Sequence, residues 1–451
     1  MNSLIVESWN PYRSDDLVAT APAASRDDVT RAAQAARTAQ AEWMSIGPTA
    51  RGAALRRIGD RLEQEAGALA GLMVREVAKP VAEAKGEMAR AIGIVHYAAQ
   101  QVLDPYGETY PNDAEGYLLT QRRPRGLAGL ITPWNFPIAI PLWKAAPALA
   151  TGNGVLLKPS PEALGCATEL VRILAAELPE GLVALLPGGA ETGSAVVSAA
   201  DAVSFTGSCA VGRTVISAAA GRGVPVQAEM GGMNPAIVLA DADIERAAAD
   251  LAYAVTGYGG QKCTATRRVL CERAVYDDVV AALRERLAGA VAGDPADPAT
   301  VVPPLINAAA TERARAVVDE AVAAGATPVY RGEGGVALLT GVPARAVLAR
   351  EELFGPVVQV AAVDSLDEAV ATANDTEYGL TAGVYGRAVD ACLRVAERLD
   401  AGMIKINAPT TGVGLHTPFG GSKASSYGPR EQGKTARDLY TQIHTITLGT
   451  P

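Results

Sequence analysis

Apolar residues recur at helical spacing along the first hundred positions. Residues 27–45 and 49–103 mix alanine and leucine with charged residues in the pattern of amphipathic helices. Asp27 and Pro48 stand where helices commonly begin, since a carboxylate caps free N–H groups and proline has no N–H to satisfy. The polar stretch 104–124, which contains proline, glycine and tyrosine, predicts an excursion with extended segments.

From residue 126 onwards, short apolar runs alternate with helix-like blocks. Strands are expected at 126–131, 154–160, 182–186, 202–207 and 224–228, and helices at 138–150, 162–177, 190–199 and 210–220. Strands that alternate with helices favour a parallel sheet with crossover helices. The pattern therefore predicts an α/β protein.

A second α/β series is expected from residue 234 to about residue 406. Its apolar segments are PAIVLA, RRVLCER, PVVQVAAV and MIKIN, and a helix is expected from Asp243. The acidic, glycine-containing segment 290–298 predicts a surface loop. The tail 438–448 alternates like an edge strand, whose unpaired N–H and C=O groups could pair with another subunit.

Composition limits the class of protein. The chain has 451 residues, 49% of them hydrophobic, which is enough for two or three structural units. A net charge of −9 disfavours nucleic acid as a partner, because phosphate contact needs a basic surface. The most apolar stretch, 127–157, contains Lys144 and four prolines, so no membrane span is expected. The N-terminus lacks the features of a signal peptide, and we expect a cytoplasmic location.

The cysteines indicate neither a disulfide scaffold nor a metal site. Their number is odd, at five, and no CxxC or Cys/His spacing occurs. Cys263 differs from the others because it follows Gly-Gly-Gln in GYGGQKCTATRR, where the backbone is free to present it to a cleft. A lone cysteine is more commonly a small buried hydrophobe, which is the interpretation of Cys166, Cys209, Cys271 and Cys392.

Two further residues have chemistry that packing explains poorly. Glu229, in QAEMGGMNP, ends a predicted strand and could act as a general base, although a capping or solvated glutamate is an equal alternative. Asn135 lies in TPWNFP, a proline-flanked turn after a strand, where an amide could donate to a developing oxyanion. A turn asparagine without a catalytic role is the commoner case.

The segment FTGSCAVGRT (205–214) predicts a strand, a glycine-rich turn and a helix whose first N–H groups could hold a pyrophosphate. It imitates a P-loop, but Arg213 stands where that loop requires lysine, so an NTPase is disfavoured. No GxGxxG fingerprint is present.

In this order, these segments resemble the aldehyde dehydrogenase superfamily. Further matches are KPS (158–160), EELFGP (351–356), NDTEYGLTAGVY (374–385) and TPFGGSKASSYGPREQG (417–433). The resemblance implies two Rossmann-like open α/β domains and a small β oligomerisation flap. It assigns 1–106 and 126–232 to a cofactor-binding domain, 233–431 to a catalytic domain, and 107–125 and 432–451 to oligomerisation strands in a homodimer or homotetramer.

The resemblance also implies residue roles. Cys263 is the nucleophile, Asn135 and the Cys263 N–H form an oxyanion hole, and Glu229 is the general base. Lys144 and Glu431 match positions linked to proton relay. NAD or NADP is the implied cofactor, with Lys158 on the adenosine ribose, Gly207 and Ser208 at the pyrophosphate, Glu352 on the nicotinamide ribose and Phe354 near the nicotinamide. The remaining implied cofactor contacts are Thr132, Pro133, Trp134, Ser160, Val211, Glu229, Met230 and Gly231.

For the substrate, a small aldehyde, Phe136 and Trp143 match tunnel-lining positions. The motifs look most like those of α-ketoglutaric semialdehyde dehydrogenases, with succinic semialdehyde or another small anionic aldehyde as an alternative. Arg267 could pair with a substrate carboxylate, unless it is structural, and His416 could contact substrate at the tunnel rim. A non-catalytic nucleotide-binding relative is the alternative from a different class.

Two departures from the family pattern stand out. Many NAD-preferring relatives have glutamate three residues after the ribose lysine, where this chain has Pro161, with Glu162 one step further on. Since a carboxylate there would repel a 2′-phosphate and Ser160 could donate to one, the sequence slightly favours NADP. The N-terminus is also short, so the first strands common in relatives are expected to be missing or reduced.

Overall fold

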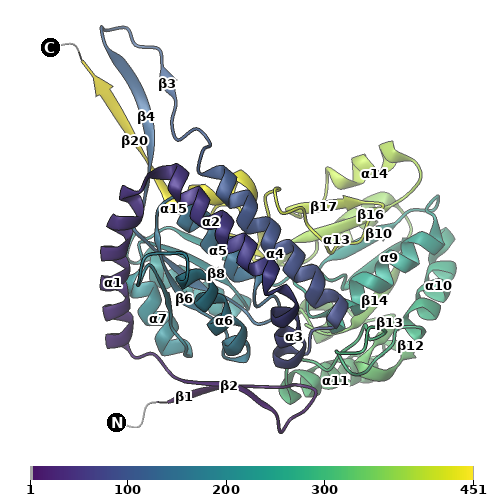
Figure 1. Ribbon diagram of the computed structural model, residues 1–451. Helices are drawn as coiled ribbons and strands as arrows, with labels where there is room; N and C mark the ends of the chain where they lie inside the picture. The colour runs from purple at the N-terminus through teal and green to yellow at the C-terminus, as the bar shows by residue number, and fades with distance from the viewer. Residues whose placement is uncertain (1–3, 450–451) are drawn as a thin grey trace.

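The computed structural model describes residues 4–449 and shows two α/β halves with a flap projecting from the first (Figure 1). The N-terminal helical region forms α1 (Arg26–Ser45), α2 (Gly47–Gln64), α3 (Ala66–Val77) and α4 (Val81–Gln101). The stretch 49–103 is thus divided into three helices. Its second break occurs because Ala78 is left-handed, with φ of 49°, and Pro80 caps the start of α4.

The first sheet has the strand order β19-β9-β8-β5-β6-β7. Its parallel strands are β5 (Leu127–Ile131), β6 (Gly154–Lys158), β7 (Val183–Leu185), β8 (Ala202–Thr206) and β9 (Val226–Glu229). The intervening helices are α5 (Ala139–Ala150), α6 (Leu164–Ala175), α7 (Ala190–Ala199) and α8 (Cys209–Ala220). The predicted alternation is confirmed. The edge strand β19 (Ser426–Tyr427) pairs antiparallel with β9, so this piece of 233–431 belongs to the first sheet and corrects the expected boundary.

The second sheet has the order β12-β13-β14-β11-β10-β16-β17 and is parallel except for the β12–β13 pair. Its strands are β10 (Pro235–Val238), β11 (Arg268–Glu272), β12 (Thr327–Arg331), β13 (Ala337–Thr340), β14 (Val357–Val363), β16 (Thr381–Tyr385) and β17 (Met403–Ile406). Its helices are α9 (Ile244–Thr256), α10 (Tyr276–Ala288), α11 (Ala308–Ala323), α12 (Val347–Arg350), α13 (Leu366–Asn374) and α14 (Val389–Ala396). Asp243 caps α9, as the sequence predicts.

The flap is a three-stranded antiparallel sheet of β20 (Thr441–Leu448), β4 (Tyr117–Pro124) and β3 (Thr109–Tyr110), in that order. The predicted edge strand is confirmed, because β20 has one free edge. Residues 432–440 are not strand: they include a 3-10 turn and α15 (Arg437–Tyr440).

The remaining strands are short. β15 (Tyr378–Gly379) pairs with β18 (Ser422–Lys423). At the N-terminus, β1 (Ile5–Trp9) and β2 (Leu17–Pro22) form an antiparallel hairpin, so strands are present in the segment expected to have them missing or reduced. No helix within residues 4–449 is long and apolar enough to cross a bilayer.

Candidate active site

Cys263 lies in a loop that follows α9 through a tight turn. Tyr258, Gly259 and Gly260 all have positive φ. Gly260 must lack a side chain, because a Cβ would lie 2.3 Å from the carbonyl oxygen of Gly355. The backbone geometry of this turn fixes the position of Cys263, the candidate nucleophile.

Arg267 holds the loop, because its guanidinium donates to the carbonyl oxygens of Gly260, Lys262 and Gly355. Arg267 is 3% exposed, its Nη2 also lies 3.7 Å from Glu352 Oε1, and it does not line the pocket that opens onto Cys263. The structure therefore favours the structural alternative over the predicted contact with a substrate carboxylate.

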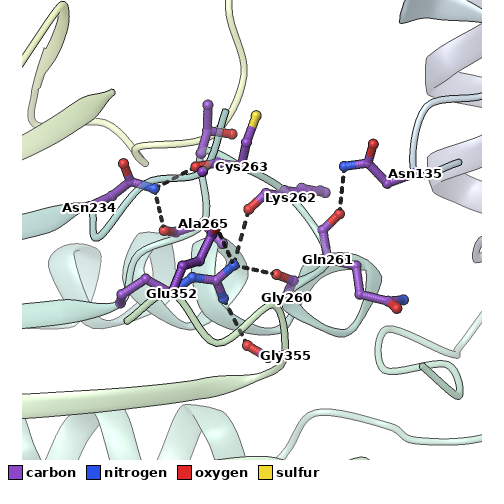
Figure 2. Close-up of polar contacts among 12 residues, drawn as sticks. Asn135, Asn234, Gly260, Gln261, Lys262, Cys263, Ala265, Glu352 and Gly355 are labelled. Atoms are coloured by element: carbon purple, nitrogen blue, oxygen red, sulfur yellow. Dashed lines mark hydrogen bonds and ion pairs between the residues drawn. The ribbon is translucent and has the colours of Figure 1, made fainter. Parts of the chain in front are cut away.

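Asn234 holds the other side of the loop and was missed at the sequence level. Its amide donates to the carbonyl oxygens of Cys263, at 2.7 Å, and Ala265, at 2.8 Å (Figure 2). No sequence motif predicts this role, because the Asn234 amide bridges a turn whose shape is defined only in the folded chain.

Burial raises the pKa of the Cys263 thiol to about 12, with the carboxylates of Glu352 and Glu229 adding to the rise. Both carboxylates therefore lie near the thiol, although the three residues are far apart in sequence. A thiol of this pKa is protonated at neutral pH, so forming the nucleophilic thiolate needs a nearby base or positive charge.

Asn135 is buried beside the same loop. Its amide Nδ2 donates to the carbonyl oxygen of Gln261 at 2.9 Å (Figure 2). A side-chain amide has two N–H donors, so one remains for an oxyanion on a carbon attached to Cys263.

A buried ion pair positions the Asn135 turn. Lys79, fully buried, donates to the carbonyl oxygen of Asn135 at 2.6 Å and pairs with Glu87. Glu87 in turn accepts from the backbone N–H groups of Ile138 and Ala139, each at 2.9 Å, where α5 begins. Neither residue was predicted, because a lysine and a glutamate on amphipathic helices look like solvated side chains in the sequence.

Glu229, 2% exposed at the end of β9, is connected to Lys144 and Glu431 by hydrogen bonds. Lys144 Nζ contacts both Glu431 and the Ser204 hydroxyl, Ser204 donates to Gln227, and Gln227 Nε2 donates to Glu229 at 2.9 Å. Burial raises the pKa of Glu229 well above its usual value, and the charge of Glu431 adds to this rise. The three predicted residues thus form one network suited to holding and moving a proton.

Most predicted cofactor residues follow the carboxyl ends of neighbouring strands. They come after β5 (Thr132, Pro133, Trp134), at or after β6 (Lys158, Ser160), after β8 (Gly207, Ser208, Val211) and at or after β9 (Glu229, Met230, Gly231). Open α/β sheets bind ligands outside these ends. The helix α8 begins here, capped by the Ser208 hydroxyl, and Val211 in its first turn is exposed.

The second half supplies Glu352 and Phe354. Glu352 lies against Gly231, where an added Cβ would be 1.9 Å from its Oε2. Thr132 Oγ1 is buried without a hydrogen-bond partner among residues 4–449, and Glu352 Oε1 has an ion-pair contact of 3.7 Å with Arg267 Nη2 but no hydrogen bond. Phe354 packs edge-on against Trp134. Unpartnered polar atoms beside a helix N-terminus fit a dinucleotide with ribose hydroxyls and a pyrophosphate.

Lys158, the lysine predicted to contact the adenosine ribose, lies near the carboxylate of Glu162. Lys158 donates to the carbonyl oxygen of Pro159, and burial lowers its pKa to about 8 against the opposing charge of Glu162. The Ser160 hydroxyl donates to Glu162 at 2.5 Å. The Ser160 hydroxyl is therefore occupied by the carboxylate of Glu162, although this glutamate stands one position later than the glutamate of many NAD-preferring relatives.

A pocket of about 380 Å³ opens onto Cys263 and holds both predicted tunnel aromatics, Phe136 and Trp143. Phe419 packs against Trp143 with ring centroids 5.5 Å apart. His416 is exposed and is not part of the pocket wall, so its predicted contact with substrate is not supported. Within residues 4–449 no group of side chains suits a metal ion.

The sequence matches the Aldehyde dehydrogenase family over residues 2–446. The chain belongs to this family. It is 36% identical to the alpha-ketoglutaric semialdehyde dehydrogenase of Bacillus subtilis (strain 168), over 98% of this chain and 94% of the relative. It is 39% identical to the alpha-ketoglutarate semialdehyde dehydrogenase of Haloferax volcanii, over 98% and 95% of the two chains.

Solved structures agree with this aldehyde dehydrogenase assignment. Betaine aldehyde dehydrogenase from Staphylococcus aureus in complex with NAD+ superposes with a TM-score of 0.94 at 29% identity, covering 99% of this chain and 92% of that one. NADP-dependent glyceraldehyde-3-phosphate dehydrogenase from Bacillus halodurans C-125, complexed with NADP, gives 0.94 at 30% identity, covering 99% and 96%. The aldehyde dehydrogenase described here is accordingly an oxidoreductase that converts aldehydes to acids, in a family whose members bind NAD or NADP.

Proposed function

We propose that this enzyme oxidises a small aldehyde with a distal carboxylate, of the α-ketoglutaric semialdehyde type, to the corresponding dicarboxylate. The observation that carries the proposal is the single pocket that joins Cys263 to the predicted tunnel aromatics. Its volume of about 380 Å³ lies at the small end of ligand pockets. Two relatives that match over nearly the whole chain are named for this type of substrate. Succinic semialdehyde is the alternative.

The chemistry assigned to the residues follows from their contacts. The Cys263 thiolate adds to the aldehyde carbon, and the oxyanion accepts from the Asn135 amide and the Cys263 N–H. When bound, the oxidised nicotinamide supplies a hydride acceptor and a positive charge that favours the thiolate. The resulting thioester is hydrolysed by water whose proton passes to Glu229, and Gln227, Lys144 and Glu431 position this carboxylate and tune its pKa.

We infer a preference for NAD over NADP, against the slight expectation from sequence. Support comes from Glu162, which accepts from Ser160 and acts on Lys158, so that a carboxylate stands where a 2′-phosphate would lie. Like charges repel, and the Ser160 hydroxyl is not free to donate to the phosphate.

Changing Glu162→Gln is expected to lower the KM for NADP about tenfold while changing the KM for NAD less than threefold, because only the 2′-phosphate meets the lost charge. Initial rates with both cofactors and one saturating aldehyde measure this. Glu191→Gln, an exposed residue on α7, is the control. Equal changes for both cofactors would contradict the inference.

A panel of aldehydes tests the substrate proposal. Purified enzyme is expected to give the highest kcat/KM with α-ketoglutaric semialdehyde, a lower value with succinic semialdehyde, and at least about tenfold less with uncharged aldehydes of equal length, since they forgo a charge-assisted contact. Reduced nicotinamide absorbance reports each rate. A preference for uncharged or aromatic aldehydes would refute the proposal.

Assembly and location remain predictions. The free edge of β20 supports the proposed homodimer or homotetramer, because an unpaired strand edge is a ready site for pairing. The cytoplasmic location rests on the sequence alone.

A further inference from the structure

Arg90, on α4, forms part of the wall of the Cys263 pocket. Its Nη1 donates to the carbonyl oxygen of Val413 and its Nη2 to Gln432 Oε1 at 2.8 Å. Its Cζ lies 5.8 Å from the centroid of the Trp143 ring. Because Val413 and Trp143 line the same pocket, the guanidinium is held between two walls of the tunnel.

The guanidinium of Arg90 has more N–H donors than it has hydrogen-bond acceptors. A guanidinium has five N–H groups, and the two recorded donations leave three. The remaining guanidinium N–H groups are suited to a ligand with acceptor oxygens.

The charged residues of the pocket also favour an anionic ligand. Lys262 is paired with Glu83 at 2.6 Å, and Glu87 is paired with Lys79 and the start of α5. Arg90 has no carboxylate within 4.0 Å among the described residues, although the charge of Glu87, one turn earlier, raises its pKa. Burial lowers the pKa of Arg90, yet a guanidinium stays charged at any physiological pH. The pocket therefore holds one positive charge without a counter-ion.

We propose that Arg90 binds the distal carboxylate of the substrate and thereby selects semialdehydes over uncharged aldehydes. This assignment rests on the proposed function and takes the place of the role that the sequence had given to Arg267. A carboxylate at the Arg90 wall satisfies the spare guanidinium donors in charge-assisted hydrogen bonds. The aldehyde end of the same molecule then faces Cys263 across a tunnel lined by Phe136 and Trp143.

The test compares two aldehydes of equal length, succinic semialdehyde and butanal. In Arg90→Met, kcat/KM for succinic semialdehyde is expected to fall about 30- to 100-fold, mostly through KM, while that for butanal changes less than about threefold. Arg90→Lys should recover part of the loss, because it restores the charge without the planar fork. Lys85→Met, an exposed change on the same helix, should leave both values unchanged.

Glutarate provides a second readout that needs no turnover of the semialdehyde. It should inhibit butanal oxidation competitively in the unchanged enzyme and in Lys85→Met, but at least about tenfold more weakly in Arg90→Met. Equal losses for both aldehydes, or undiminished glutarate inhibition, would overturn the assignment of Arg90. If Arg90→Met does not fold, the comparison in Arg90→Lys decides between the two outcomes. Failure of the unchanged enzyme to oxidise either aldehyde would instead count against the proposed function.

Discussion

Replacing Cys263 with alanine is expected to abolish aldehyde oxidation while leaving dinucleotide binding intact. In the proposed mechanism the thiol forms the covalent intermediate, and no other cysteine of residues 4–449 lines the pocket. Removing a nucleophile commonly costs at least about 10⁴-fold in kcat, because the rest of the site cannot replace the covalent step. Most of the predicted cofactor residues lie at the strand ends of the first sheet, and their side chains are unchanged in the variant.

Reduced nicotinamide absorbance measures the activity, and calorimetric titration with NAD measures binding. Cys392→Ala serves as the control, because this buried cysteine on α14 packs in the core of the second half. Residual activity above about one per cent of the unchanged enzyme would show that Cys263 is not the nucleophile. Loss of NAD affinity in Cys263→Ala alone would show that the thiol loop also shapes the cofactor cleft.

Changing Glu229→Gln is expected to separate the two halves of the reaction. Steady-state kcat should fall about 10²- to 10⁴-fold, since general-base catalysis contributes that much to thioester hydrolysis. The first turnover should survive, so mixing enzyme, NAD and aldehyde should release about one reduced nicotinamide per site in a rapid burst. Rapid-mixing absorbance measures burst and steady rate together. A missing burst would place Glu229 before hydride transfer instead.

The pH dependence gives an independent check on Glu229. Burial and Glu431 raise its pKa, so the basic form is present only at pH values well above the usual carboxylic range. Hydrolysis of the thioester should therefore slow as the pH falls through this raised pKa, and kcat should rise with pH until the carboxyl is deprotonated. In Glu229→Gln this acid limb should disappear from the remaining activity, whereas the exposed Glu191→Gln should retain it.

The alternation of apolar runs was sufficient to predict the first sheet. Each strand from β5 to β9 was expected within a few residues, because a fully buried parallel strand is apolar on both faces and stands out between amphipathic helices. The N-terminal hairpin β1–β2 and the edge strand β19 were not foreseen. These short strands are half exposed, and β19 also pairs with a strand that is distant in sequence.

Short sequence motifs were sufficient to select the candidate catalytic residues. Cys263, Glu229 and Asn135 lie in motifs that resemble those of the family, and their residue types suit the proposed reaction. Arg267 shows the limit of such reasoning, since an arginine after the nucleophile has the right chemistry for a carboxylate and still donates to carbonyl oxygens that hold the loop.

Which of the charged side chains are paired can be read only from the folded chain. Amphipathic helices and loops commonly expose charged residues, and the sequence pattern does not show which of them are paired in the fold. The residues concerned are Lys79, Glu87, Arg90 and Lys262. The fold pairs Lys79 with Glu87 and Lys262 with Glu83, and it leaves Arg90 in the pocket wall without a carboxylate partner among residues 4–449. Pairing depends on distances of a few ångströms between helices and loops far apart in the chain, and periodicity carries no information about them.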